Sequence, residues 1–87
     1  MFYIYILKST KTDKLYIGFT NNIFNRIKEH NAQKSLATKA FTPYYLIYFE
    51  GYRSKTDAIR REKNLKYFGQ AYRRLKERIS DSLQGNL

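Results

Sequence analysis

Three side chains with the chemistry to handle a phosphate group lie close together between residues 14 and 30: Tyr16, Arg26 and His30. The planar fork of an arginine binds two phosphate oxygens at once and stabilises charge that develops during phosphoryl transfer. A tyrosine beside a cation ionises more readily and becomes a usable general base, and a histidine orients a tyrosine, shuttles a proton or contacts phosphate. Each residue also has an ordinary interpretation, as a packed aromatic or as a polar residue on a helix surface.

Glu62 is the sharpest single signal outside that stretch. At about 100° per residue, it falls in the middle of the apolar stripe that Ala58, Ile59 and Leu65 mark on a predicted helix. Carboxylates are rarely buried without a partner, so Glu62 needs a cation. One alternative is an ion pair with Arg26, Arg60 or another basic side chain. The other is Mg²⁺, which binds a small number of protein carboxylates together with water and phosphate oxygens.

The composition indicates a polyanionic partner. The 87 residues carry 17 lysines and arginines against 7 acidic residues, for a formal net charge of +10, with nine tyrosines and six phenylalanines. Basic side chains neutralise phosphates and aromatic rings stack on unpaired bases, which favours nucleic acid; the alternative is a basic surface over a tyrosine-rich core. There is no cysteine, and no signal peptide or membrane span is evident, so we expect a cytoplasmic protein with no membrane partner.

Local patterns predict the elements that must position these residues. Segments rich in aromatic and β-branched residues are predicted strands, at about 2–8, 14–19 and 44–51. Capping residues followed by apolar residues at helical spacing predict helices, at about 22–32, 55–67 and 70–83. A polar turn between the first two strands indicates an antiparallel hairpin, and the basic stretch 31–43 is expected to be a long loop. We expect one domain over residues 1–87.

Two tripeptides and three further residues follow one another in a distinctive order. Tyr3-Ile4-Tyr5 precedes Tyr16-Ile17-Gly18, Arg26 comes ten residues after Tyr16, His30 follows one helical turn later, and Glu62 stands four residues after Ala58. Each tripeptide is a weak motif alone, but the ordered spacing is specific. This arrangement resembles the GIY-YIG nuclease family over nearly the whole chain. The compact size is similar to that of small stand-alone members related to the nuclease domain of UvrC.

The resemblance implies an α+β fold, in which helices flank a three-stranded antiparallel sheet, and an activity. It implies an endonuclease that hydrolyses DNA phosphodiester bonds in repair or recombination, with one Mg²⁺ or Mn²⁺ ion. By position, Tyr5 and Tyr16 are the paired tyrosines, one of them acting as general base, with a slight preference for Tyr16. Arg26 binds the scissile phosphate, His30 assists, and Glu62 holds the metal.

Five further residues are candidate nucleic-acid contacts: Lys8, Lys14, Asn22, Lys34 and Lys39. The expected partner is DNA, in branched or single-stranded form, with RNA as another possibility. The main alternative to an enzyme is a module that binds single-stranded DNA or RNA without cutting it. A third interpretation is a subunit that depends on a protein partner for its targeting.

Overall fold

The computed structural model describes residues 1–85, and a three-stranded sheet lies at its centre. The strands are β1 (Phe2–Ser9), β2 (Leu15–Thr20) and β3 (Tyr44–Tyr52), arranged in the order β2-β1-β3. Both neighbouring pairs are antiparallel. Because β1 is the middle strand, it hydrogen-bonds on both edges, and the predicted α+β fold with a three-stranded antiparallel sheet is confirmed.

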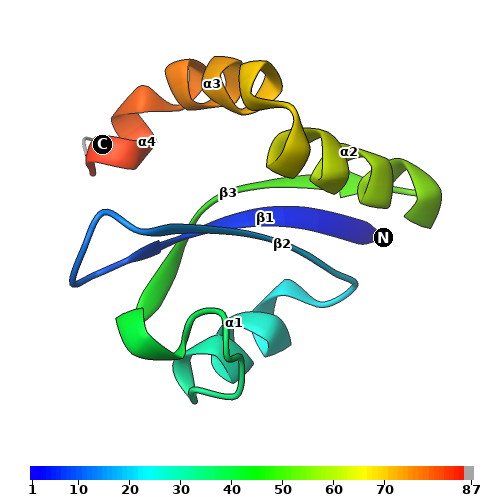
Figure 1. The fold of residues 1–87 in the computed structure, drawn as a ribbon. Helices are drawn as coiled ribbons and strands as arrows, with labels where there is room; N and C mark the ends of the chain where they lie inside the picture. The colour runs from blue at the N-terminus through cyan, green and yellow to red at the C-terminus, as the bar shows by residue number, and fades with distance from the viewer. Residues whose placement is uncertain (86–87) are drawn as a thin grey trace.

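Helices cover both faces of this sheet, as Figure 1 shows. α1 (Ile23–Asn31) lies against one face, while α2 (Lys55–Tyr67) and α3 (Gly69–Arg78) lie across the other. The short α4 (Ser80–Gln84) ends the described chain on the same side as α3. The sheet is therefore the middle layer of three, and a site at its edge is reachable from helices of both outer layers.

Alternation along β1 divides the core between the two faces, since successive side chains of a strand point in opposite directions. Ile4 and Ile6 pack with the buried residues of α2 and α3. Tyr5 and Leu7 pack with Tyr44 and with the inner side of α1. All four β1 side chains are at most 1% exposed, which explains why this strand is apolar and aromatic throughout.

Side-chain hydrogen bonds cap the N-termini of α1 and α2, the two helices that follow strands. The Oδ1 atom of Asn22 accepts a hydrogen bond from the backbone N–H of Asn25 at 3.1 Å and starts α1. Ser54 Oγ accepts from the N–H of Asp57 at 3.3 Å and starts α2, as the Ser-x-x-Asp spacing predicts. α1 thus begins directly after β2, and this short connection sets Arg26 beside the sheet.

Two segments differ from the sequence prediction. The single helix expected over 70–83 is interrupted at Ile79, whose backbone has φ −111° and ψ 29°, so that α3 and α4 are separate helices. Lys8 Nζ donates to the carbonyl oxygen of Leu83 at 2.5 Å and fastens α4 to β1. The loop expected over 31–43 contains a 3₁₀ helix, η1 (Lys39–Phe41).

Within residues 1–85, no helix has the length and apolar character needed to cross a membrane. The single-domain organisation and the cytoplasmic location stay predictions.

Candidate active site

The two motif tyrosines meet over Gly18. Tyr5 on β1 pairs with Gly18 on β2, and its ring lies across the glycine backbone. A Cβ atom at position 18 would lie 2.3 Å from both Cζ and the hydroxyl oxygen of Tyr5 and 2.9 Å from Cε1 of Tyr16. No side chain fits there. The glycine of the second tripeptide therefore provides the space in which the two phenol rings come together, with centroids 6.2 Å apart.

His30 is hydrogen-bonded to the hydroxyl of Tyr5. Its Nε2 atom is 3.0 Å from the Tyr5 hydroxyl, its Nδ1 atom is 2.8 Å from Thr38 Oγ1, and the side chain is 0% exposed. Burial, together with the positive charge of Arg26, lowers the pKa of His30 to about 4. The neutral ring has one donor and one acceptor nitrogen, so it donates one of these bonds and accepts the other. His30 is a buried anchor for Tyr5.

The two tyrosines differ in environment. Tyr5 is 1% exposed, and burial raises its pKa to about 12, although the neighbouring Arg26 guanidinium acts in the opposite direction. The charges of Tyr16 and Glu62 add to the rise. Tyr16 is only partly buried and its ring lies 4.8 Å from that of His30. Tyr5 therefore stays protonated at neutral pH, and Tyr16 is the phenol that water reaches.

Arg26 projects from α1 at the edge of this cluster. Its Nη1 atom is 2.8 Å from a carboxylate oxygen of Glu29, and the Arg26 side chain is 30% exposed. Glu29 is 47% exposed, and ion pairs this open contribute little to stability. Because the guanidinium also acts on the Tyr5 phenol, Arg26 lies within interaction range of Tyr5 while part of its side chain is open to solvent. A phosphate can replace Glu29 as its partner.

Glu62 approaches from α2, on the opposite outer layer. Its side chain is 19% exposed, and its carboxylate lies 3.4 Å from Lys66 Nζ, which in turn is 5.8 Å from the centroid of the Tyr16 ring. The ion-pair alternative is thus realised with Lys66, and neither Arg26 nor Arg60 pairs with Glu62. An oxygen donor of this kind fits Mg²⁺ or Mn²⁺, which keep several water ligands and bind substrate phosphate oxygens. Among residues 1–85, no group of three or more His, Cys, Asp or Glu side chains is placed to hold a metal ion.

The structure therefore brings Tyr5, Tyr16, Arg26 and His30 into one cluster, with Glu62 near enough to act on Tyr5 electrostatically. These side chains come from β1, β2, α1 and α2. Their catalytic and metal-binding roles stay predictions.

The candidate nucleic-acid contacts are dispersed. Lys8 is engaged with α4, on the far face of the sheet from Tyr5, and Asn22 serves as the cap of α1. Lys14 Nζ lies 5.4 Å from the centroid of the Phe41 ring. Lys34 and Lys39 are exposed on the connection between α1 and β3. The lysines of that connection are thus the freest of the five to meet a polyanion.

Two features of the site were missed in the sequence. Thr38 is 0% exposed and holds His30, but it lies in the stretch expected to be an irregular loop, where no periodicity marks a buried position. Lys66 lies one helical turn after Glu62, and the i, i+4 spacing is a signal that could have identified it as the ion-pair partner.

A second partly buried carboxylate was also missed. Glu50 on β3 is 17% exposed and accepts hydrogen bonds from the hydroxyls of Tyr48 and Tyr52 and from Nε and Nη2 of Arg61, at 2.9 and 3.0 Å for the arginine. Burial raises the pKa of Glu50, but these donors outweigh burial and the net shift is downward. Burial and the neighbouring Glu50 carboxylate raise the pKa of Tyr48 and that of Tyr52 to about 12. Glu50 is therefore fully paired and is a structural carboxylate of the α2 face.

Comparison with known proteins identifies the class. The family described as the GIY-YIG catalytic domain matches residues 1–78, so the chain belongs to the GIY-YIG family, a nuclease superfamily, and this indicates an endonuclease. Among curated proteins, it is similar to small proteins named UPF0213. The match to the Staphylococcus haemolyticus protein is 45% identical over 67 residues, covering 76% of this chain and 80% of the relative.

Two further relatives show the same pattern. A UPF0213 protein of Clostridium perfringens is 43% identical over 67 residues, covering 76% of this chain and 71% of its own length. One of Bacillus licheniformis is 40% identical over 77 residues, covering 87% of this chain and 75% of the relative. No solved structure matches. The similarity to these relatives thus extends over most of the chain, and the family match over residues 1–78 includes the segments that carry the clustered residues.

Proposed function

We propose that this protein is a divalent-metal-dependent endonuclease that hydrolyses phosphodiester bonds in DNA, with a role in repair or recombination. The observation that carries the proposal is the convergence of Tyr5, Tyr16, His30 and Arg26 around Gly18, from elements separated in the chain. Membership of a nuclease superfamily supports the same reaction class. The net charge of +10 supports a polyanionic substrate.

The reaction starts with a phosphate diester bound at Arg26. The guanidinium exchanges Glu29 for two phosphate oxygens and neutralises the charge that builds up on phosphorus. Tyr16 acts as the general base that takes a proton from the attacking water, because it is the more open of the two tyrosines. The water oxygen forms a bond to phosphorus as the opposite P–O bond breaks, and the departing oxygen is protonated by solvent.

Tyr5 and His30 organise this site. The hydrogen bond between them fixes the Tyr5 ring over Gly18, and the ring limits where Tyr16 can lie. Glu62 would hold one Mg²⁺ or Mn²⁺ ion, which supplies Lewis-acid stabilisation of phosphate charge when bound. Lys66 sits beside Glu62, so binding of the cation requires that Lys66 move away from the carboxylate.

A cleavage assay with matched variants tests the proposal. Purified protein is incubated with branched, single-stranded and duplex DNA in the presence of Mg²⁺ or Mn²⁺. We expect cleavage by the unaltered protein and by a Glu77→Gln control, since Glu77 is exposed on α3, and no cleavage by Glu62→Gln. Equal cleavage by Glu62→Gln and by the unaltered protein would refute the proposed role of Glu62 in binding the metal.

A binding module that does not cut is the competing function. Basic and aromatic side chains alone are sufficient to hold single-stranded DNA or RNA. That alternative predicts tight, salt-dependent binding with no cleavage in either metal. Cleavage that appears only after a cell extract is added would favour a subunit that needs a protein partner.

A further inference from the structure

An aromatic groove lies on the α1 face of the sheet, beside the N-terminal turn of α1. It has a volume of about 260 Å³, below the roughly 300–1,000 Å³ of pockets for drug-sized ligands. Its lining joins β1, β3 and the start of α1, and comprises Tyr3, Asn21, Asn22, Ile23, Phe24, Leu46 and Phe49. Its size suits a small flat ligand.

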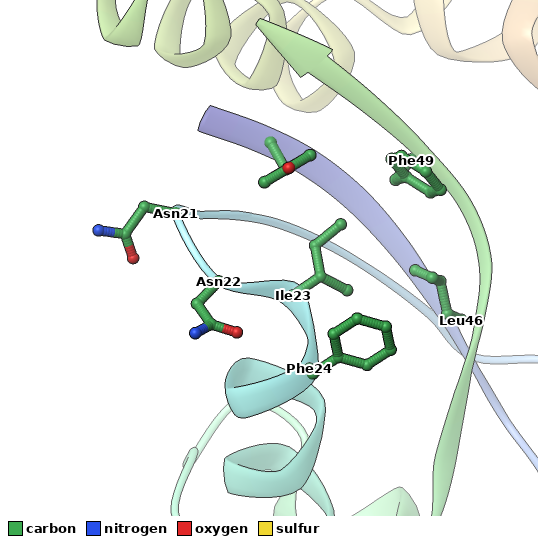
Figure 2. Close-up of a pocket in the computed structure, with 7 residues that line it drawn as sticks. Asn21, Asn22, Ile23, Phe24, Leu46 and Phe49 are labelled. Atoms are coloured by element: carbon green, nitrogen blue, oxygen red, sulfur yellow. The ribbon is translucent and has the colours of Figure 1, made fainter. Parts of the chain in front are cut away.

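Exposed aromatic rings dominate this aromatic groove. Phe24 is 80% exposed and Phe49 is 51% exposed, which is unusual for phenylalanine in a chain this small. Figure 2 shows Ile23 and Phe24 pointing from α1 toward Leu46, with Phe49 further along β3. Tyr3 and Phe49 form an edge-to-face pair with ring centroids 6.0 Å apart. The groove therefore offers apolar ring surfaces to an incoming flat group.

Polar groups at the rim suit a nucleic acid. Asn21 and Asn22 lie in the turn before α1. Asn22 Oδ1 already accepts from the backbone N–H of Asn25, so Asn22 offers its side-chain N–H donors to a base edge, whereas the Asn21 amide has both a donor and an acceptor. The first turn of α1 contains no acidic residue. The positive end of the helix dipole is thus left without a neighbouring negative charge that would repel a phosphate.

The aromatic groove and the candidate active site lie on opposite flanks of α1. Phe24 and Arg26 stand two positions apart on α1, which separates them by about 160° around the helix and places them on opposite flanks. Tyr3 and Tyr5 stand two positions apart on β1 with their side chains on the same face, roughly 7 Å apart along the strand. A DNA strand with a phosphate at Arg26 has to cross the first turn of α1 to reach the groove.

We propose that the aromatic groove binds an unpaired nucleobase of the DNA strand whose phosphate lies at Arg26, by stacking on Phe24 and Phe49. The inference rests on the proposed function and specifies its substrate, because a base can enter the groove only when it is not paired. The preferred substrate is therefore single-stranded DNA or the unpaired region next to a branch. A second copy of this chain is the competing occupant, and its charge of +10 opposes self-association.

Fluorescence of a 2-aminopurine base in a single-stranded oligonucleotide tests this proposal, since stacking quenches it. Binding is measured without metal, so that no cleavage occurs. We expect the unaltered protein to quench the probe, and Phe24→Ala and Phe49→Ala each to lose the quench and weaken binding about 5-fold or more. Phe68→Ala is the matched control, because Phe68 is 62% exposed at the end of α2, and it should bind as the unaltered protein does.

The possible results distinguish a nucleobase in the aromatic groove from a second copy of the chain, and they separate the groove proposal from the nuclease proposal. Unchanged quench and affinity in Phe24→Ala and Phe49→Ala would overturn the proposal. A change from dimer to monomer on sedimentation of Phe24→Ala, with the quench retained, would overturn it in favour of a second copy of the chain. A lack of cleavage by the unaltered protein with metal refutes the nuclease function but not the groove, whereas cleavage without any quench refutes the groove alone.

Discussion

The burial of His30 predicts a specific loss of stability in acid. In the folded protein the pKa of His30 is about 4, whereas an exposed histidine in the unfolded chain titrates near 6.5. Between these values the unfolded state binds more protons, so stability falls as the pH falls from about 6.5 to about 4. From about pH 7.5 to about pH 5, this difference in pKa lowers the free energy of unfolding by about 2 kcal/mol.

A His30→Gln variant isolates that contribution. Glutamine keeps an amide able to hydrogen-bond Tyr5 or Thr38, but it does not titrate. We expect it to be less stable than the unaltered protein at about pH 7.5 and to lose about 2 kcal/mol less between that pH and about pH 5. Urea denaturation followed by circular dichroism measures both free energies. Parallel pH profiles for the two proteins would refute the buried, neutral state of His30.

Three further predictions concern packing and pairing. Gly18→Ala should lower the free energy of unfolding, measured by urea denaturation, by about 1–3 kcal/mol and abolish DNA cleavage, because its Cβ would collide with the Tyr5 ring. Gly69→Ala is the control that should cost no stability, since no atom lies near a Cβ at position 69. Equal stabilities of the two variants would contradict the contact between position 18 and Tyr5. Glu50→Gln should cost about 1–3 kcal/mol by leaving Arg61 without a carboxylate, and an unchanged urea midpoint would show that this pair is not stabilising. Thr38→Val should reduce DNA cleavage while leaving substrate affinity unchanged, since Thr38 acts only through His30; lost affinity would indicate a contact with DNA.

The sheet and the first two long helices were predictable because their signals are local. β1 is buried on both faces, so its run of aromatic and β-branched residues has no polar position. Asn22 and Ser54 mark the helix starts through their own side chains. The break at Ile79 was not predictable, because the apolar spacing continues across it from Leu75 to Leu83. Tertiary contact of α4 with β1 through Lys8 accompanies that break.

The candidate site was predictable in its members but not in its chemistry. Spacing and family resemblance indicated Tyr5, Tyr16, Arg26, His30 and Glu62, and the structure gathers the first four. It could not be seen in the sequence that the histidine is fully buried, because that depends on a long-range contact with the connection before β3. For the same reason, the different environments of the two tyrosines emerge only once Gly18 is seen beneath the Tyr5 ring.

The central claim is that one metal ion at Glu62 and a phosphate at Arg26 meet beside Tyr16. A crystal structure of the protein with Mn²⁺ and a short single-stranded DNA tests it most directly, since the ion is located by its anomalous scattering. We expect Mn²⁺ bound to the Glu62 carboxylate and to a phosphate oxygen, with the same phosphate contacted by Arg26. Mn²⁺ bound elsewhere, or a DNA strand whose phosphates do not approach Arg26, would contradict the account.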